Sequence, residues 1–372
     1  MKVELPAKAI LAAVRQVQPA TLKNKQQPVL GCVLVEADDG SVTLSATNLE
    51  HGVRVRLALT VPPGRPGRVA VSAERLAAVL AEAGTGPVSL DARDELLRVG
   101  AGAARFELPT YRADQFPEIP TPPADVPGLT VAAADLARLI AHTAFAADTK
   151  DTAARYALTG VLFHVAGPSL TLIATDSKRL AVDAAAAEAD HGADTKVDRP
   201  HLVPARLLRI VEGVLPGGPE PVRIVLRPNE AFFTAVGCQV WVRLVEGRFP
   251  PWEKIMPKAL KGTATLPADE FRRKLRQAAI MADRTASRVD VTFAPAKVRL
   301  QARGAETGES DVWMDAPYEG PGVAVAFNPA FVEEFLASTG EPTVTLHLKD
   351  ESSPVMFTAG PKQACVIMTL IR

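Results

Sequence analysis

The stretches "SVTLSATN" (residues 41–48) and "SLTLIATD" (169–176) are nearly the same strand, written twice in one chain. Five of their eight positions are identical, and the last position pairs Asn48 with Asp176. Each stretch ends a longer match, because "PVLGCVLVEADDGSVTLSAT" (28–47) aligns with "ALTGVLFHVAGPSLTLIAT" (157–175). Both matches are two apolar runs around a turn that contains glycine, which is typical of a β-hairpin. A weaker third copy is "RVDVTFAPAKVRLQARG" (288–304), so the chain is a repeat protein.

The segments that flank the three hairpins repeat as well. Apolar residues at helical spacing precede the hairpins, starting from Leu5, Val131 and Leu266. A second predicted helix follows each hairpin and ends at a glycine stop signal; these helices cover 71–84, 203–217 and 327–340. A proline and an alternating strand come next, from Pro87, Pro221 and Pro342. The units close with further strands at 104–108, 240–245 and 364–370.

The repeats predict an α+β protein made of three equivalent domains, each with two helices packed on antiparallel sheets. Proline-rich stretches at 116–128 and 249–258 separate the copies. We therefore expect the domains to cover residues 1–123, 124–257 and 258–372.

Composition and motifs argue against several classes of function. The chain has 42 basic and 42 acidic residues, so no overall charge points to a partner. No apolar run has the length of a membrane span, no apolar leader opens the chain, and Cys32, Cys238 and Cys365 lie far apart among apolar neighbours. We expect a cytoplasmic protein whose cysteines are small core residues.

No phosphate-loop, dinucleotide, metal-ligand or Cys-x-x-Cys pattern occurs in the sequence. Asp176 is interpreted as a turn residue at a strand end rather than a catalytic carboxylate. We therefore expect no catalysis, no cofactor and no metal. An α+β enzyme on a duplicated scaffold stays as the alternative from another class.

Local charge is concentrated on the helices that precede the hairpins. In the third copy, Phe271 and Leu275 share an apolar face, with arginines on the opposite face. The first two copies behave similarly, and basic residues just past those helices extend the pattern. The predicted DNA-facing residues are Lys8, Arg15, Lys23, Lys25, Arg138, Lys150, Arg155, Arg273, Arg276 and Arg284. Such a surface would bind duplex DNA through its phosphates, without reading sequence.

Two apolar residues break the pattern of the third basic helix. Ile280 lies opposite the core face, between Arg276 and Arg284, and Met281 also lies off that face. Isolated exposed apolar residues are common, but two adjacent ones make this position a candidate subunit contact.

The whole chain resembles the bacterial sliding-clamp family, the beta subunit of DNA polymerase III. The most specific segments are residues 30–50, 156–182, "EGRFPPWEKIMP" (246–257), "FRRKLRQAAIMAD" (271–283) and "ACVIMTLIR" (364–372). The resemblance implies a head-to-tail homodimer whose six domains form a ring on double-stranded DNA, at the nucleoid. It also implies that short linear peptides bind the replicative polymerase alpha subunit, the clamp loader, other DNA polymerases and repair proteins to the ring.

The resemblance further assigns residues to two contacts. It places the dimer interface at Arg75, Phe106 and Leu108 of one chain and at Ile280 and Met281 of the other. The implied peptide slot consists of Leu158, Thr175, Ser177, Lys178, Arg179, Leu180, Pro250, Lys254, Ile255, Asn328, Phe331, Val366, Met368 and Leu370. Apolar side chains would form the slot, and Arg179 or Asn328 would hold polar groups of the peptide.

The chain departs from the family's pattern in or beside that slot. Ser177 and Lys178 stand where the family usually has Gly followed by an aromatic residue or His. Lys254 stands where Arg is common, and Thr369 follows Met368 where the family has Pro. A specialised second clamp, adapted to an inhibitor or a repair polymerase, is therefore the alternative within the family.

Overall fold

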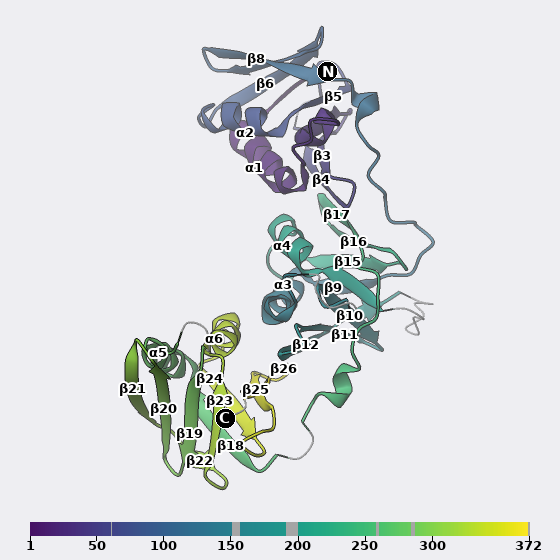
Figure 1. Cartoon of the computed structure of the whole chain (residues 1–372). Helices are drawn as coiled ribbons and strands as arrows, with labels where there is room; N and C mark the ends of the chain where they lie inside the picture. Colours follow the sequence, from purple (N-terminus) through teal and green to yellow (C-terminus); the bar gives the residue numbers. More distant parts are fainter. Residues whose placement is uncertain (61, 151–156, 191–199, 258–259, 284–286, 371–372) are drawn as a thin grey trace. The chain divides into compact units, whose positions relative to one another are not determined.

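The computed structural model describes residues 1–60, 62–150, 157–190, 200–257, 260–283 and 287–370 (Figure 1). The chain divides into two compact units. The first comprises Met1–Asp135, Glu188–Asp194 and Arg206–Leu244, and the second comprises Leu136–Ala187, Thr195–Ala205 and Val245–Arg372. None of the helices that the structure describes is both long and apolar enough to cross a membrane.

The first unit is built on one antiparallel sheet with strand order β1-β6-β7-β8-β5-β2-β3-β4-β17-β16-β15-β9-β13. Its helices are α1 (Ala7–Val17), α2 (Ala73–Ala81) and α4 (Ala205–Val214), with short 3₁₀ turns at Gln18–Ala20, Pro28–Gly31 and Ala113–Gln115. Its strands are β1 (Lys2–Pro6), β2 (Cys32–Ala37), β3 (Ser41–Thr47), β4 (His51–Ala58), β5 (Gly67–Ser72), β6 (Pro87–Arg93), β7 (Leu96–Ala101), β8 (Ala104–Tyr111), β9 (Leu129–Ala132), β13 (Glu188–Ala189), β15 (Pro221–Leu226), β16 (Glu230–Ala235) and β17 (Cys238–Arg243).

The second unit holds two sheets, with orders β14-β10-β11-β12-β26-β25-β24-β18-β22 and β21-β20-β19-β23. Its helices are α3 (Ala133–Thr143), α5 (Ala268–Ala279) and α6 (Pro329–Ser338), with 3₁₀ turns η4 (Ala144–Ala146) and η5 (Trp252–Lys254). Its strands are β10 (Gly160–Ala166), β11 (Ser169–Thr175), β12 (Arg179–Ala186), β14 (His201–Pro204), β18 (Gly262–Pro267), β19 (Val289–Ala294), β20 (Lys297–Gly304), β21 (Gly308–Asp315), β22 (Tyr318–Glu319), β23 (Val323–Phe327), β24 (Thr343–Leu348), β25 (Val355–Ala359) and β26 (Gln363–Ile367).

The three predicted hairpins are confirmed as antiparallel pairs, β2 with β3, β10 with β11 and β19 with β20. The predicted helices are confirmed too, but Leu5, Val131 and Leu266 belong to strands that run directly into them. In β1 the side chains alternate between exposed and buried, and Pro6 keeps an extended backbone, so α1 begins only at Ala7. The glycine stop was wrong for α6, because Thr339 ends that helix in an extended conformation.

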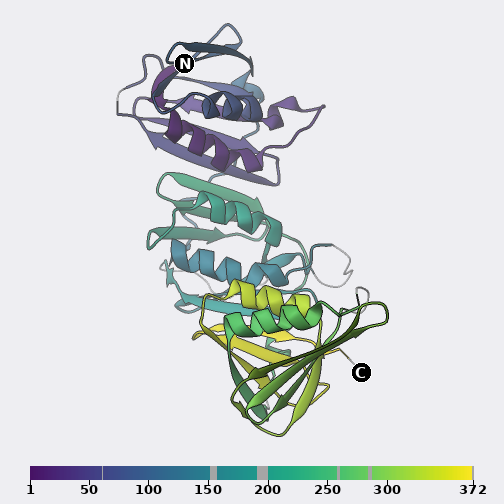
Figure 2. The same ribbon diagram turned by 90° about the vertical axis from the view of Figure 1, so that its left-hand side faces the viewer.

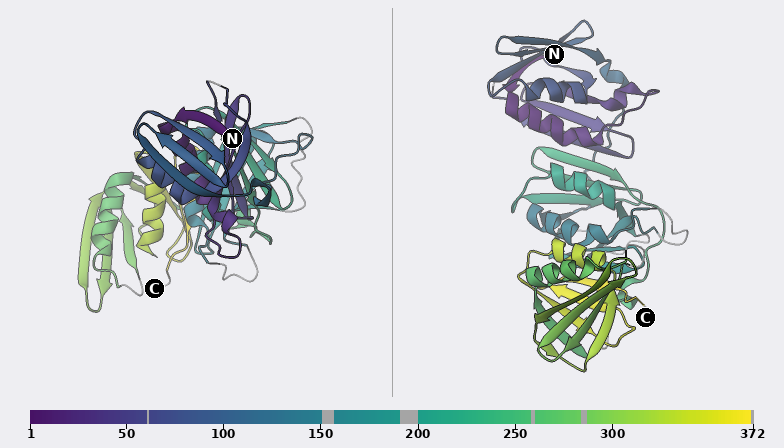
Figure 3. Two further views of the ribbon diagram at one scale, coloured as in Figure 1. Left: turned by 90° about the horizontal axis from the view of Figure 1, so that it is seen from above. Right: turned by 60° about the vertical axis from the view of Figure 1, so that its left-hand side comes forward.

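Each helix of a repeat covers the sheet with one apolar face. In α1, Ile10, Val14 and Val17 are fully buried, and α1 lies beside α2, as the right-hand view of Figure 3 shows. In α5, Phe271 is fully buried, and Figure 2 shows α5 next to α6 in front of their strands. Burying such side chains contributes about 1.5–3 kcal/mol each, so this packing holds the helices in place.

The sheets cross the boundaries between sequence repeats. Strand β17, late in the second repeat, pairs with β4 of the first, with Val53 opposite Val240. Strand β26, late in the third repeat, pairs with β12 of the second, with Leu180 opposite Val366. Each compact unit therefore combines parts of two repeats and does not coincide with the three sequence copies.

The cysteines are free thiols, and Cys32 and Cys365 are buried, as expected for small core residues. Burial raises the pKa of the Cys32 thiol to about 11 and that of Cys365 to about 12. Cys238 is only half-buried. All three thiols therefore stay protonated near neutral pH.

Candidate functional site

A tight turn joins β11 to β12 and is held by its own side chains. The Asp176 carboxylate accepts hydrogen bonds from the backbone N–H groups of Lys178 (2.9 Å) and Arg179 (3.0 Å). The Thr175 hydroxyl donates to the Arg179 carbonyl (2.6 Å) and accepts from the Ser177 N–H (3.2 Å). The interpretation of Asp176 as a turn residue is confirmed.

The same turn occurs in the first repeat, between β3 and β4. The Thr47 hydroxyl donates to the His51 carbonyl (2.7 Å), and Asn48 accepts from the N–H of Glu50 and of His51, both at 3.0 Å. The third turn residue has a positive φ in both copies, 75° at Leu49 and 72° at Ser177. The residues shared by the two sequence stretches therefore form the same turn in both repeats, and this turn leads from the second strand of the hairpin to the next strand.

A mostly apolar cavity of about 200 Å³ lies beside the second of these turns. It is lined by Leu158, Thr175, Ser177, Arg179, Leu180, Pro250, Ile255, Val366 and Met368. All nine residues belong to the set of fourteen that the family resemblance had suggested. They come from the residues before β10, the turn and the start of β12, the segment that leads into the third repeat, and β26 with the residue after it.

The cavity rests on a continuous apolar cluster. Leu162, Ile173, Val182 and Leu202 are buried beneath it, and Phe249, Trp252 and Met256 pack against this cluster from the connecting segment. The backbone of Met368 is held by a hydrogen bond from its N–H to the Lys178 carbonyl (2.9 Å). Apolar packing and this hydrogen bond therefore hold the segments that form the walls of the cavity in place.

The other five suggested slot residues do not line the cavity. Lys178 and Lys254 are exposed, and Asn328 caps α6 by accepting from the Ala330 N–H (3.0 Å). The Leu370 N–H donates to the Ala326 carbonyl (2.8 Å). Phe331 contacts a residue of the cavity wall, because its ring centre lies 4.6 Å from the Arg179 guanidinium carbon.

Arg179 is buried, with only 8% of the residue exposed. Its Nη2 donates to the Phe145 carbonyl (2.7 Å), its Nη1 pairs with the Glu334 carboxylate, and its Nε lies 3.2 Å from Asp176. The rings of Phe145 and Phe331 flank the guanidinium. Sequence reasoning missed Glu334 and Phe145. The position of Glu334 on α6, three residues after Phe331, was the one local signal that could have found it.

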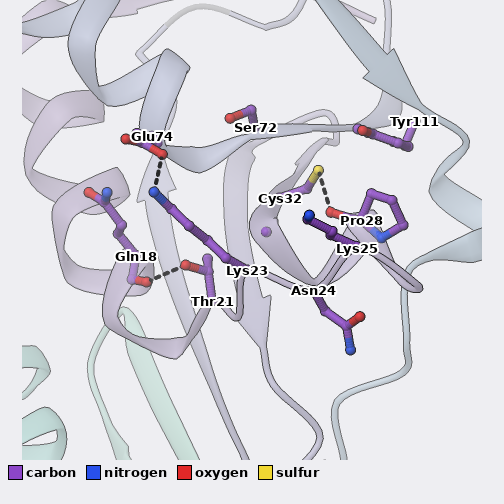
Figure 4. A pocket seen from close by; sticks show the side chains of 11 residues that line it. Gln18, Thr21, Lys23, Asn24, Lys25, Pro28, Cys32, Ser72, Glu74 and Tyr111 are labelled. Atoms are coloured by element: carbon purple, nitrogen blue, oxygen red, sulfur yellow. Dashed lines mark hydrogen bonds and ion pairs between the residues drawn. The ribbon is translucent and has the colours of Figure 1, made fainter.

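The basic residues of the first unit lie where solvent reaches them. Lys8, Arg15, Lys23 and Lys25 are all exposed. The Lys23 ammonium pairs with Glu74 at 2.8 Å, in a pocket of about 600 Å³ with mixed polar and apolar walls, to which Lys25 also contributes (Figure 4). An exposed pair of this kind contributes little stability, so Lys23 can exchange Glu74 for another anion.

The basic residues of the second unit differ from one another. Lys150 and Arg273 are exposed, and Arg276 lies 3.8 Å from Glu333. Arg138 instead pairs with the fully buried Asp183. Arg155 and Arg284 lie outside the described residues.

The suggested interface residues occupy two places, one in each unit. In the first unit Arg75 is exposed, Phe106 half-buried and Leu108 buried. In the second unit Ile280 has 69% of its surface exposed, and Met281 is half-buried. Among the residues that the structure describes, no group of three or more His, Cys, Asp and Glu residues could hold a metal ion.

Comparisons with known proteins match the whole length of the chain. Three family models of the DNA polymerase III beta subunit match it in order, the N-terminal domain at 1–120, the central domain at 130–251 and the C-terminal domain at 253–370. The beta sliding clamp of Escherichia coli K12 is 26% identical over 372 residues, covering 100% of this chain and 99% of the relative. The beta sliding clamp of Streptomyces coelicolor is 26% identical over 369 residues, covering 97% and 94%.

Solved structures share the fold. The sliding clamp of Pseudomonas aeruginosa bound to griselimycin superposes with a TM-score of 0.92 at 24% identity, over 100% of both chains. The clamp of Bacillus subtilis gives a TM-score of 0.91 at 20% identity, over 100% of this chain and 99% of that one. With three clamp domains matched in order along its length, the chain belongs to the DNA polymerase III beta-subunit family, the sliding clamps, and is a processivity factor of DNA replication rather than an enzyme.

Proposed function

We propose that two copies of this chain close head to tail into a ring of six domains, covering 1–123, 124–257 and 258–372 in each copy, around duplex DNA. The observation that carries the proposal is the way strands join successive repeats. Strand β4 pairs with β17, and β12 pairs with β26 in the same manner. These two pairings join the first repeat to the second and the second to the third. The equivalent pairing between the third repeat and the first would have to be made with another copy of the chain.

The strand orders support β21 and β8 as the two partners of that junction. The groups β5-β2-β3-β4, β14-β10-β11-β12 and β23-β19-β20-β21 are equivalent, so β21 corresponds to β4 and β12. Strand β8 corresponds to β17 and β26, as the last strand of its repeat. Among the described strands, β21 pairs only with β20. Strand β8 pairs with β7 along one edge, and along its other edge it pairs with β5 only at Thr110 and Tyr111. Pairing β21 of one copy with β8 of another completes the pattern, and a twofold axis closes it.

The suggested interface residues fit this junction. Phe106 and Leu108 lie on β8, and Arg75 lies on α2 of the same unit. Met281 lies beside β21, because its carbonyl accepts from the Thr307 hydroxyl (2.7 Å) just before that strand. The exposed Ile280 would become buried in the pair. Sedimentation velocity tests the dimer, and a monomer at micromolar concentration would contradict it.

A ring would hold DNA by enclosing it, with weak phosphate contacts that let it slide. The exposed Lys8, Arg15, Lys23, Lys25 and Arg273 support this role. Arg138 contributes less, since Asp183 already balances its charge. The test is to load the protein on nicked circular DNA with the clamp loader and then linearise the DNA. Release from linear but not circular DNA is expected, and retention on linear DNA would refute enclosure.

The cavity beside the 175–179 turn is proposed as the partner slot. Its volume of about 200 Å³ is below the roughly 300–1,000 Å³ of small-molecule sites, and its walls are mostly apolar. It suits apolar side chains of a peptide from the polymerase alpha subunit, the clamp loader, or other polymerases and repair proteins.

A fluorescein-labelled octapeptide with Leu-Phe at its centre tests the slot by fluorescence anisotropy. Met368→Arg places a charge at the cavity, on a side chain that is 45% exposed, so the fold should survive. Val236→Arg, at a position 86% exposed in the first unit, is the matched control. Loss of binding in the first variant and not the second is expected, and equal binding by both would refute the slot.

One observation favours the specialised clamp as the second candidate. Ser177 holds a φ of 72°, a region that suits glycine, and it lines the cavity. Serine in place of glycine adds a polar side chain to the slot, so partner affinity is expected to differ from that of an ordinary clamp. The same octapeptide, titrated against this chain and the E. coli clamp, decides the question, and equal affinity would remove this candidate.

A further inference from the structure

The two strand junctions inside the chain use the same register. In the first, Arg54 of β4 lies opposite Gln239 of β17, and the Arg54 guanidinium donates to the Gln239 side chain (3.1 Å). In the second, Val182 of β12 lies opposite Ala364 of β26. In both pairs the first member lies opposite the fifth residue of its hairpin partner, β3 or β11, and the other member is the second residue of its own strand.

The strands β21 and β8 carry the same two positions. Asp311 lies opposite Gln301, the fifth residue of β20, and Arg105 is the second residue of β8. If two copies pair in the register of the internal junctions, Asp311 of one copy lies opposite Arg105 of the other. Trp313 then lies opposite Ala103, in the turn before β8. Arg105 becomes the diagonal neighbour of Trp313, about 7–8 Å away and within reach of long side chains.

The sheet face that carries these positions is covered at both internal junctions. In the first unit the connecting segment covers it, since a Cβ added at Gly52 would lie 2.7 Å from the Ile119 side chain. In the second unit the segment after β17 packs over the equivalent residues. No such segment joins one copy to another, so this face is open to solvent at a junction between copies. The equivalent residues of β21 are exposed; they are Glu309, Asp311 and Trp313.

Trp313 is a large apolar side chain on this open face, with 48% of its surface exposed. The Arg299 guanidinium lies over its ring, 5.0 Å from the ring centre, and donates two hydrogen bonds of 2.8 Å to Asp311. These three side chains therefore form one group at the edge of the sheet before any partner arrives.

Arg105 has the charge and the surroundings to complete this group. It is exposed, and its guanidinium donates to the carbonyls of Gly102 (2.7 Å) and Ala104 (3.0 Å), which do not balance its charge. The small side chains of Ala103 and Ala104 leave room beside it for an indole ring.

We propose that Asp311 and Trp313 form an outer contact of the ring junction, on the sheet face that the connecting segments cover elsewhere. Asp311 of one copy pairs with Arg105 of the other, and the Trp313 ring lies between that Arg105 and its own Arg299. The inference rests on the proposed ring, and it adds the strand register of the junction and the residues that hold it.

The charges on the strands limit the alternatives. In the proposed register Glu309 lies opposite Glu107, whose charge is balanced by Arg98 at 2.9 Å. A slip by one residue turns the side chains of a strand to the wrong face. A slip by two residues sets Asp311 against Glu107 or Glu309 against Arg105. The last arrangement keeps an ion pair, so an experiment has to separate it from the proposed one.

Cysteine cross-linking reads the register. Arg105→Cys combined with Asp311→Cys places the two Cα atoms about 5.5 Å apart in the proposed register, within the range of a disulfide. Arg105→Cys combined with Glu309→Cys is the matched control, with the Cα atoms too far apart. Both variants are oxidised at a concentration at which sedimentation velocity shows a dimer. We expect a covalent dimer from the first pair and at least about tenfold less from the second.

Trp313→Ala measures what the outer contact contributes. Tryptophans that become buried at interfaces are among the strongest contributors to binding, so the Kd of the dimer is expected to rise about tenfold or more in sedimentation velocity. Val236→Ala, in the turn between β16 and β17, removes an apolar side chain that is 86% exposed and should leave the Kd unchanged. Urea unfolding of both variants checks that the fold is kept.

Three results overturn the inference. The first is a dimeric Arg105→Cys, Asp311→Cys variant that does not cross-link, and the second is equal or stronger cross-linking in the control pair. The third is an unchanged dimer Kd in Trp313→Ala. A wild-type chain that stays monomeric at micromolar concentration would contradict the proposed ring itself, and this contact with it.

Discussion

Replacing Arg179 by methionine tests the view that this residue holds three segments of the second unit together. The substitution keeps an unbranched side chain of similar length and removes the guanidinium. It loses a hydrogen bond from a charged donor to the Phe145 carbonyl, about 1.5–3 kcal/mol. It also loses the pair with the half-exposed Glu334, about 0.5 kcal/mol, and two ring contacts of about 0.5–1 kcal/mol each. The arginine no longer has to be desolvated, which offsets part of the loss, so we expect a net cost of about 3 kcal/mol.

Urea unfolding followed by tryptophan fluorescence measures this cost. Trp252 and Trp313 report on the second unit, which contains Arg179, and Trp241 reports on the first. Arg276→Met is the control, since that side chain is 57% exposed, and a change within about 0.5 kcal/mol is expected. A cost below about 1 kcal/mol for Arg179→Met, or one equal to that of the control, would refute the role of Arg179 as a structural tie.

Three further outcomes are expected. Ser177→Gly should raise the free energy of unfolding by about 0.5–1 kcal/mol in urea titrations, because Ser177 has a φ of 72°, which strains the backbone of any residue other than glycine. Leu49→Gly, at a φ of 75°, should have the same effect. A loss of stability in both variants would contradict this strain. Burial raises the pKa of Asp183, but hydrogen bonds and a positive charge from its neighbours bring it below the ordinary value. The contribution of Asp183 to the free energy of unfolding is therefore present above the unfolded pKa of about 4 and is lost as pH falls through the lower folded value. In Asp183→Asn the free energy of unfolding, measured from pH 6 to pH 2, should depend less on pH. Ile280→Asp should weaken the dimer at least about tenfold in sedimentation velocity by placing a charge in the interface, whereas Val236→Asp should leave it unchanged.

The sequence predicted the hairpins and helices because their signals are local and occur three times. It missed β1, β9 and β18 because each runs without a gap into a helix. Leu5 satisfies both the alternating pattern of β1 and the spacing of α1. Leu5 lies in a strand rather than in the helix because β1 pairs with β6, about 85 residues later. No local sequence pattern shows this pairing.

The candidate site shows the same division between local and long-range information. The turn at Asp176 followed from its residue types, and the family resemblance suggested every residue that lines the cavity. The partners of the basic residues did not follow. A helical wheel points Arg138 away from the apolar face, but Asp183, a buried acid on β12, pairs with it. Glu334 reaches Arg179 across 155 residues, and only the folded chain brings them together.

The pairing of β4 with β17 has a consequence for dividing this polypeptide. Expressing residues 1–123 alone would strip β17 from β4 and leave five residues, from His51 to Val55, without the neighbours they have in the intact chain. A bare edge of that length is a template for aggregation. The sequence repeats are thus not the segments that can be expressed separately in soluble form. A soluble fragment of the first repeat should keep a strand that pairs with β4 in place of β17.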